Sequence, residues 1–195
     1  MNPALPERLA RRVAIATPFM NHYVDRVRFP GGRIIEEHHV IEFPRPAVAA
    51  LIERGEECAA RERAADPAAR ADDILLAAVY RYVTGRVEWE LPGGCVDEGE
   101  SLIEAARREA FEETGYETRD HRMLYTFHPM NGVCSQTFHI TRCEAVARTG
   151  APDPNEIHEV RWFPRAALRE SVRAGEIQGG LTLVALLLLF AGLDT

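Results

Sequence analysis

The sequence predicts an α/β or α+β sandwich, in which helices pack on a mixed β-sheet. Runs of β-branched and apolar residues recur along the chain, helical patterns are inserted late, and the most apolar segment lies near the C-terminal end. Such elements bury their apolar faces by stacking in layers. At 195 residues, the chain is long enough for one sizeable core and short for two.

Residues 1–45 form a first region, in which we interpret 33–43 as a strand that follows the turn Pro30-Gly31-Gly32. A unit of this size buries too little surface to fold alone, so it must pack on its own chain or on a partner subunit. Its apolar residues are numerous enough to cover one face: Val13, Ile15, Val24, Val27, Ile34, Ile35, Val40 and Ile41.

The segment 53–73 follows an apolar run at 47–52, is rich in charged residues and alanine, and shows no apolar face. This composition predicts an exposed loop or a short solvated helix. A lid, or an arm that contacts a partner, is the functional alternative.

The rest of the chain contains the regular elements of the sandwich. Strands are predicted at 74–83, 88–91, 123–127, 137–146 and 157–163, and helices at 102–114, 164–174 and 181–193. Pro164 suits a first helical turn, and Gly175 suits a helix end. The last helix is shorter than the roughly 18 to 20 residues of a membrane span, so we expect it to be buried on most sides.

The formal net charge of −7 excludes bulk attraction to nucleic acid or to an anionic membrane surface. A phosphorylated small molecule can still bind where a metal ion reverses the local charge. The N-terminus lacks the apolar run of a secretory signal, which favours a cytoplasmic protein. The cysteines form no C-x-x-C pair and are predicted to be free, buried thiols: Cys58, Cys95, Cys134 and Cys143.

The helix predicted at 102–114 carries clear end signals. Ser101 and Glu104 form a capping box at its start, and Gly115 is placed to end it in a left-handed conformation. The small and apolar residues on one face favour close packing against a neighbouring element.

Another face of the same helix is acidic. Glu109, Glu112 and Glu113 stand at i, i+3 and i+4, where like charges destabilise a helix. A Mg²⁺ ion would remove that repulsion and gain oxygen ligands. A solvated acidic face without a metal is the alternative.

The fixed residues of this segment match a longer pattern: a glycine, five residues, a glutamate, seven residues, and then R-E-U-x-E-E-x-G-U, where U is a bulky aliphatic residue. The matching positions are Gly94, Glu100, Arg108, Glu109, Glu112, Glu113 and Gly115. The segment therefore resembles the box of the Nudix hydrolase family. Ala110 and Tyr116 depart from the two U positions, which are packing positions.

The resemblance extends to the ADP-ribose pyrophosphatase branch of that family. It is carried by Tyr80-Arg81, Trp89 to Gly94, Trp162-Phe163-Pro164 and Gly175-Glu176-Ile177. It implies an α/β/α sandwich with a mixed sheet at 46–195. It also implies a small N-terminal β region at 1–45, through which enzymes of this branch commonly form homodimers.

By this resemblance, Glu109 and Glu113 would be the main ligands of Mg²⁺, with Mn²⁺ as the alternative ion. Glu112 would be a further ligand, directly or through water, and Gly93 would contribute its carbonyl. Glu100 and Arg108 would pair and hold the loop and helix in place, which orients the ligands.

The family commonly needs one more carboxylate beyond the box, as general base or metal ligand. Glu156 is favoured because it precedes the predicted strand at 157–163 and so lies on a loop, whereas Glu159 lies inside the strand. Arg81 resembles an arginine that binds a substrate phosphate, with a surface ion pair as the alternative. The aromatic ring that stacks on a base is left open among Tyr23, Phe29 and Trp89.

The implied reaction is hydrolysis of the diphosphate linkage of a nucleoside diphosphate sugar, such as ADP-ribose, to a nucleoside monophosphate and a sugar phosphate. Two positions depart from the ADP-ribose pattern, because Asn131 replaces an expected proline and Val79 an expected glutamine. The alternatives are a Nudix hydrolase of another nucleoside diphosphate or triphosphate compound, and a non-catalytic Nudix-like ligand sensor.

Overall fold

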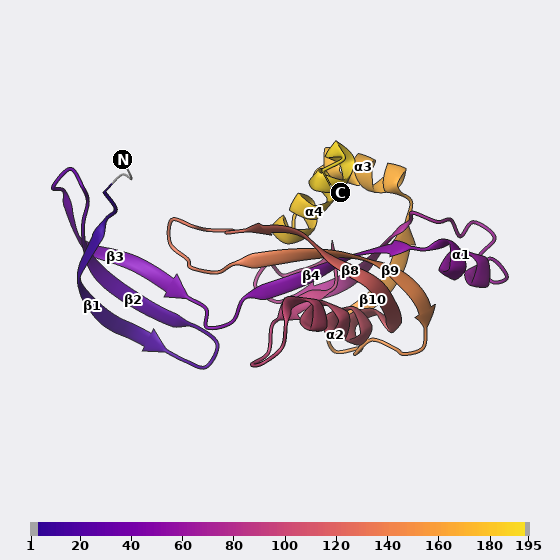
Figure 1. Ribbon diagram of the computed structural model, residues 1–195, viewed down its shortest axis with the longest axis horizontal. Helices are drawn as coiled ribbons and strands as arrows, with labels where there is room; N and C mark the ends of the chain where they lie inside the picture. Colours follow the sequence, from indigo (N-terminus) through magenta and orange to yellow (C-terminus); the bar gives the residue numbers. More distant parts are fainter. Residues whose placement is uncertain (1–3, 194–195) are drawn as a thin grey trace. The chain divides into compact units, whose positions relative to one another are not determined.

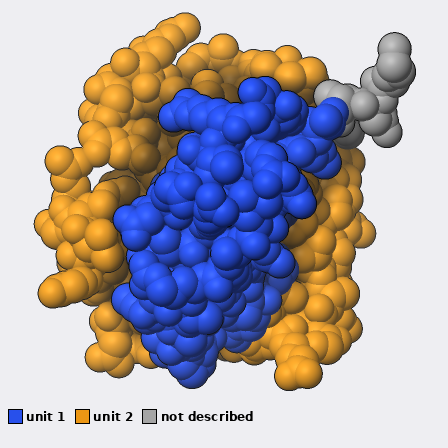
Figure 2. All heavy atoms as spheres, turned by 90° about the vertical axis from the view of Figure 1, so that its left-hand side faces the viewer, with its two compact units in different colours: residues 1–46, 128–137 blue, residues 47–127, 138–195 orange. Residues whose placement is uncertain are grey.

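The computed structural model describes residues 4–193, and the chain divides into two compact units. Unit 1 comprises residues 1–46 and 128–137, and unit 2 comprises residues 47–127 and 138–195 (Figure 2). The sequence does not predict that 128–137 belong to unit 1, because a pairing between segments so far apart leaves no local periodicity.

Unit 1 is an antiparallel sheet of three strands in chain order. Its strands are β1 (Glu7–Ala16), β2 (Asn21–Arg28) and β3 (Ile34–Glu42). The strand predicted at 33–43 is therefore β3. The turn before it places Gly32 at a φ of 85°, which a glycine adopts without strain.

The core of unit 1 is small. Ile41 of β3 donates its N–H to the Val133 carbonyl at 2.7 Å, which attaches residues 128–137 to the sheet. Across the described residues of this unit, the buried apolar side chains are those of Val24 and Cys134. Almost every residue of β1 is exposed.

Unit 2 contains a seven-stranded mixed sheet. Its strands are β4 (Ala47–Arg54), β5 (Ile74–Arg81), β6 (Arg86–Glu90), β7 (Gly93–Cys95), β8 (Tyr116–Phe127), β9 (Phe138–Arg148) and β10 (Ile157–Phe163). The main path runs β10-β5-β4-β9-β8, while β6 pairs with β5 and β7 pairs with β4. β4 and β9 run parallel, and the other paired strands are antiparallel.

Helices cover both faces of this sheet (Figure 1). They are α1 (Glu56–Glu62), α2 (Leu102–Thr114), α3 (Arg165–Arg173) and α4 (Gly180–Ala191). Successive residues of a strand point to opposite faces: Leu51 of β4 packs in one cluster with Leu186 of α4, and Val48 packs in another with Ala105 of α2. The predicted α/β/α sandwich with a mixed sheet is confirmed.

Several element bounds differ from the predicted ones. β10 matches the prediction, whereas β8 begins directly after α2, because the charged residues at its start hide the strand pattern. β5 ends at Arg81, since the chain then turns back into β6 with Gly85 at a φ of 67°. α4 is only partly buried, since four of its twelve residues are buried, five are intermediate and three are exposed. No helix within residues 4–193 is long and apolar enough to cross a membrane.

The segment 53–73 is more buried than its composition suggests. Its first half forms α1, in which Cys58 and Ala59 are 1% and 0% exposed, so the prediction of a segment with no apolar face is wrong. Cys58 packs in a cluster with Cys143 of β9. Two small side chains suffice to anchor a helix of seven residues, and they are too few to give a visible stripe in the sequence.

Three of the four cysteines behave as predicted. Cys58, Cys134 and Cys143 are free and buried, and burial raises the pKa of the Cys58 thiol to about 11. Cys95 is exposed, so its predicted burial is wrong. It is the last residue of the three-residue strand β7, where the chain leaves the sheet for the loop before α2.

Candidate active site

Both ends of α2 are fixed by local interactions. The Ser101 hydroxyl accepts a hydrogen bond from the Glu104 N–H at 3.3 Å, and the Glu104 carboxylate accepts one from the Ser101 N–H at 2.8 Å. This confirms the capping box, and Gly115 ends the helix at a φ of 74°. Three fully buried alanines let α2 lie close to the sheet, which fixes where its glutamates emerge: Ala105, Ala106 and Ala110.

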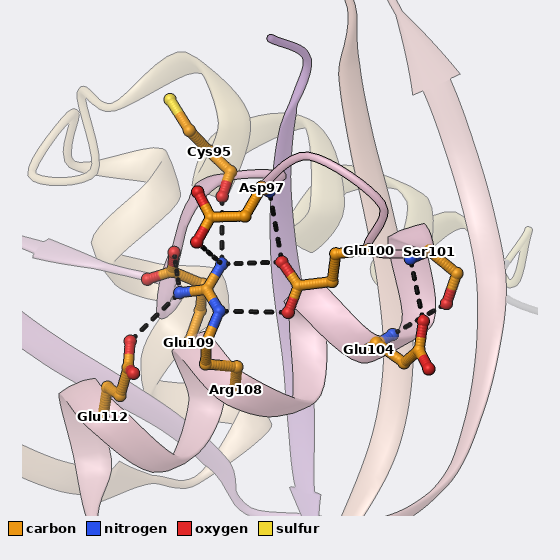
Figure 3. A network of polar contacts seen from close by, with 8 residues as sticks. All are labelled: Cys95, Asp97, Glu100, Ser101, Glu104, Arg108, Glu109 and Glu112. Carbon is orange, nitrogen blue, oxygen red and sulfur yellow. Dashed lines mark hydrogen bonds and ion pairs between the residues drawn. The ribbon is translucent and has the colours of Figure 1, made fainter.

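Arg108 organises the acidic residues around it, as Figure 3 shows. Its Nε and Nη2 donate to the two carboxylate oxygens of Glu100 at 3.0 and 2.9 Å. Its Nη1 donates to Glu109 at 2.8 Å and to Glu112 at 3.0 Å, and Nη2 also donates to the Cys95 carbonyl. The hydrogen bonds with Glu100 are the main reason that the pKa of Arg108 is raised and the pKa of Glu100 is lowered.

Four glutamates line one cavity of about 500 Å³ in unit 2. Glu109, Glu112 and Glu113 belong to α2, and Glu156 belongs to the loop before β10. The remaining lining residues are Phe111, Ala151, Pro152, Asp153, Pro154 and Ile157. The structure thus brings together the four residues that the sequence analysis proposed as catalytic, although Glu156 is distant from the others in sequence.

The loop 151–154 is a part of this cavity that sequence reasoning missed. Its composition, Ala-Pro-Asp-Pro, is a turn signal that marks a loop without indicating where the loop packs. The Asp153 carboxylate accepts hydrogen bonds from the N–H and the side-chain amide of Asn155, so it is used to hold the turn. The proline rings and Phe111 provide an apolar wall beside the acidic one.

Glu113 is held in a less polar environment than an ordinary surface glutamate. Burial raises its pKa to about 7, the N–H of Gly93 opposes the rise with a hydrogen bond of 2.8 Å, and the charges of Glu109 and Glu156 add to it. Burial also raises the pKa of Glu109, against the effect of Arg108. A positive ion in the cavity would favour the charged form of both groups.

Two glycines of β7 lie too close to their neighbours to carry a side chain. A Cβ atom at Gly94 would lie 2.7 Å from Cδ of Glu109, so any side chain there would displace that carboxylate. A Cβ atom at Gly93 would lie 2.7 Å from Cα of Ala49, in the neighbouring strand. The Gly93 N–H donates a hydrogen bond to the Glu113 carboxylate. Metal binding by the Gly93 carbonyl stays a prediction.

The donor set fits a hard divalent cation such as Mg²⁺. Every candidate ligand is an oxygen, and the carboxylates repel one another across a partly desolvated cavity. Within residues 4–193, however, no group of three acidic, histidine or cysteine side chains is already closed around a single point. The reason is visible at Arg108, which draws the carboxylates of Glu109 and Glu112 toward itself.

The other predicted site residues lie outside this cavity. Arg81 borders a different hollow, of about 780 Å³, and donates Nε and Nη2 to Glu90, at 2.8 Å each. Its charge still lowers the pKa of Glu113. Glu159 is bound by the guanidinium of Arg161 at 2.7 to 2.9 Å and does not line the cavity.

The three aromatic candidates for base stacking have different surroundings. Trp89 packs edge-on against Phe163 with ring centroids 4.9 Å apart, and the Arg161 guanidinium covers it at 4.9 Å. Tyr23 and Phe29 belong to unit 1, where the Arg11 guanidinium lies 4.0 Å from the Tyr23 ring. The Trp89 ring is therefore already engaged in packing.

Comparison with known families decides the affiliation that the box suggests. The profile described as the NUDIX domain matches residues 44–180, which is most of the chain. The chain belongs to the Nudix family. The predicted resemblance to the Nudix family is confirmed. The matched residues include those that line the cavity, and also Arg81 and Arg108.

Two relatives are named for the nucleotide compounds on which they act. The CMP-5'-(N-acetyl-N-hydroxy-3-aminopropyl)phosphonate hydrolase of Streptomyces rubellomurinus is 35% identical over 90% of this chain and 78% of its own length. The ADP-ribose pyrophosphatase of Mycobacterium tuberculosis is 27% identical over 86% of this chain and 74% of its own. Nudix enzymes typically use a divalent metal ion.

A solved structure supports the fold. A crystal structure of an ADP compounds hydrolase superimposes with a TM-score of 0.77, covering 99% of this chain and 96% of its own. The sequences are 18% identical, so this likeness concerns the fold alone.

Proposed function

We propose that this Nudix hydrolase uses Mg²⁺ to cleave the diphosphate linkage of a nucleoside diphosphate sugar, ADP-ribose or a compound like it. The products are a nucleoside monophosphate and a sugar phosphate. The observation that carries the proposal is the cavity in which Glu109, Glu112, Glu113 and Glu156 meet. The cavity provides several oxygen ligands for a cation beside a carboxylate on a separate loop.

Glutamates of α2 would bind the metal ion, and Arg108 would orient two of them. Glu109 and Glu113 would hold the metal ion, with Glu112 beside them. When bound, the ion neutralises diphosphate oxygens and lowers the pKa of water. Arg108 does not touch the substrate, because its donors orient Glu100, Glu109 and Glu112.

Glu156 would accept the proton of the attacking water. The water oxygen forms a bond to phosphorus while the bridging P–O bond breaks, and the bridging oxygen leaves with the other product. Glu156 suits the task because, within residues 4–193, its carboxylate has no hydrogen-bond or ion-pair partner, whereas Glu159 is bound to Arg161. Positioning and charge neutralisation dominate catalysis of this kind.

Arg81 would bind a phosphate of the substrate. Its pairing with Glu90 uses Nε and Nη2, and Nη1 has no hydrogen-bond partner among the described residues. Arginine is well suited to phosphate because its planar group can donate several hydrogen bonds at once.

A cytidine nucleotide joined to a phosphonate is the second candidate substrate. The relative that acts on such a compound is 35% identical over 90% of this chain. Two positions also depart from the ADP-ribose pattern, Asn131 and Val79. The general reaction is the same for both candidates, because each contains a nucleotide joined to a second phosphorus-bearing group.

A substrate panel followed by ³¹P NMR would test the proposal. It would contain ADP-ribose, an ADP-hexose, a CMP-phosphonate and a nucleoside triphosphate, each with Mg²⁺ and with Mn²⁺. We expect the fastest release of a nucleoside monophosphate from ADP-ribose, with Glu113→Gln as the inactive control. Preference for the phosphonate or the triphosphate would replace the proposed substrate. Absence of any hydrolysis by the folded protein would favour the ligand sensor.

We also propose that the protein is a homodimer, with the N-terminal region, residues 1–45, supplying much of the contact. Unit 1 has few buried apolar residues, while Val13 and Phe19 are 57% and 74% exposed. Exposed apolar side chains on a sheet with so little core indicate a surface that a partner covers. Symmetric dimers are the commonest oligomers.

A further inference from the structure

The loop that carries Glu156 has its own internal turn. The Asp153 carbonyl accepts hydrogen bonds from the Glu156 N–H at 3.2 Å and the Ile157 N–H at 2.9 Å. These bonds fix the shape of the turn, but they do not fix its position against the sheet. The Glu156 carboxylate itself has no partner within residues 4–193, so its direction depends on how its backbone is anchored.

The anchor is the end of strand β5. The Tyr80 N–H donates to the Glu156 carbonyl at 3.2 Å, which extends the pairing of β5 and β10 one step beyond Val79 and Ile157. The next step of β10 is irregular, because Ile157 pairs with Val79 and Glu159 pairs with Ala78. His158 is therefore the extra residue of a β-bulge, a feature that redirects side chains near active sites.

The redirected His158 meets the side chain of the same tyrosine. The Tyr80 hydroxyl and His158 Nδ1 are 2.9 Å apart and hydrogen-bonded, and the rings meet edge-on with centroids 5.7 Å apart. Tyr80 thus holds the loop at two points, through its N–H at Glu156 and its hydroxyl at His158. Both contacts lie within two residues of the glutamate.

We propose that the hydrogen bond between Tyr80 and His158 positions Glu156 for hydrolysis. Tyr80 and His158 are then positioning residues, because they act through the loop and not on the substrate. This inference rests on the proposed function of Glu156 as the general base. The same strand end carries Arg81, so β5 aligns the base and the phosphate-binding arginine together.

The kinetic test compares variants that differ in this one hydrogen bond. Tyr80→Phe keeps the ring and removes the hydroxyl, and His158→Leu removes the nitrogen. Each should lower kcat by about fivefold with KM changed less than about twofold, since a net hydrogen bond of this kind is worth about 1 kcal/mol. His158→Asn, which returns a polar atom near the Nδ1 position, should restore most of kcat.

Combined variants separate positioning from other roles. The double variant Tyr80→Phe with His158→Leu should be no slower than either single variant. In a Glu156→Gln background, Tyr80→Phe should have no further effect, because the group it positions is gone. A rise in KM at unchanged kcat would show instead that Tyr80 contacts substrate, and additive losses with Glu156→Gln would overturn the inference.

Hydrogen exchange of the intact protein tests the positioning without any substrate. Tyr80→Phe should speed amide exchange in residues 153–158, while Tyr125→Phe serves as the control. Tyr125 is 50% exposed, close to the 48% of Tyr80, and lies on β8 away from this contact. Unchanged exchange in Tyr80→Phe would overturn the inference even if the enzyme is active. If Tyr80→Phe speeds exchange but the wild-type protein hydrolyses no substrate, the result would support the positioning of the loop by Tyr80 and refute the proposed function.

Discussion

At the scale of single residues, Arg108 explains why Glu109 and Glu112 can share one face of α2. Its guanidinium offers five donors, and these engage Glu100, Glu109, Glu112 and the Cys95 carbonyl. Like charges at these spacings would otherwise destabilise α2. Glu113 is outside this network: the Gly93 amide and the charge of Arg81 lower its pKa, but burial outweighs them, which makes it the glutamate most dependent on a cation.

Replacing Glu113 by glutamine should separate activity from stability. The substitution removes a charge that would bind the metal ion, so kcat should fall by orders of magnitude. The glutamine oxygen can still accept from Gly93, and burying a neutral amide avoids the desolvation that raises the pKa of Glu113. The midpoint of thermal unfolding should therefore stay the same or rise. Near wild-type turnover would remove Glu113 from the ligand set.

The two glutamates near β10 form a matched pair for testing the general base. Glu156 lines the cavity, whereas Glu159 is bound by Arg161 on the strand. Glu156→Gln should reduce kcat more than Glu159→Gln does, measured under saturating substrate and Mg²⁺. A larger loss of kcat in Glu159→Gln would mean that the general base is Glu159 or one of the glutamates of the Nudix box.

At the scale of elements, the end of α2 and the loop carrying Glu156 are joined at Gly115. Its carbonyl accepts hydrogen bonds from the N–H groups of Thr149 and Gly150, at 2.9 and 3.0 Å. A Cβ atom at this position would collide with the Gly150 carbonyl oxygen. The last glycine of the box therefore ends a helix and also lets the chain that leads to the base pass close to it.

Gly115→Ala should cost more stability than strain alone explains. Left-handed backbone costs an alanine about 1–2 kcal/mol, and the collision with Gly150 adds to that. Gly85→Ala is the control, because Gly85 has a similar φ of 67° with no atom within 4 Å of the added carbon. Urea unfolding should show the larger loss for Gly115→Ala. Equal losses of unfolding free energy in the two variants would mean that the chain at Gly150 moves away from residue 115 without a cost in stability.

At the scale of the whole molecule, the two units differ in how well each can sustain its own fold. Unit 2 has apolar clusters on both sides of its sheet, while the described part of unit 1 is mostly exposed. Unit 1 also contains ion pairs that fix its strands, such as Arg11 with Asp25 at 2.8 Å. Ion pairs specify a register, but they replace little apolar burial.

Sedimentation at micromolar concentration should therefore give a particle of about twice the chain mass of 21.8 kDa. Ile15→Asp should shift the particle toward the monomer, because it puts a charge on an exposed apolar position of β1. Leu187→Asp, with similar exposure on α4, should leave the dimer intact. A monomer that turns over substrate at the wild-type rate would contradict a site that needs the partner.

The sequence by itself determined the features that depend on neighbours within a turn or two of helix. The capping box at Ser101, the left-handed end at Gly115 and the shared face of Glu109, Glu112 and Glu113 all follow from local spacing. The spacing of the box also sufficed to identify the family, because each fixed residue has a geometric task close to the helix.

Only the tertiary structure decided which distant groups meet. The approach of Glu156 to α2 depends on the pairing of β10 with β5. The hydrogen bond between Tyr80 and His158 depends on a bulge that local periodicity does not reveal. The burial of Cys58 and Ala59 in α1, the exposure of Cys95 and the inclusion of residues 128–137 in unit 1 also depend on which distant segments meet. Side-chain periodicity records which face of an element is apolar, whereas the partner of that face is chosen by packing across the whole chain.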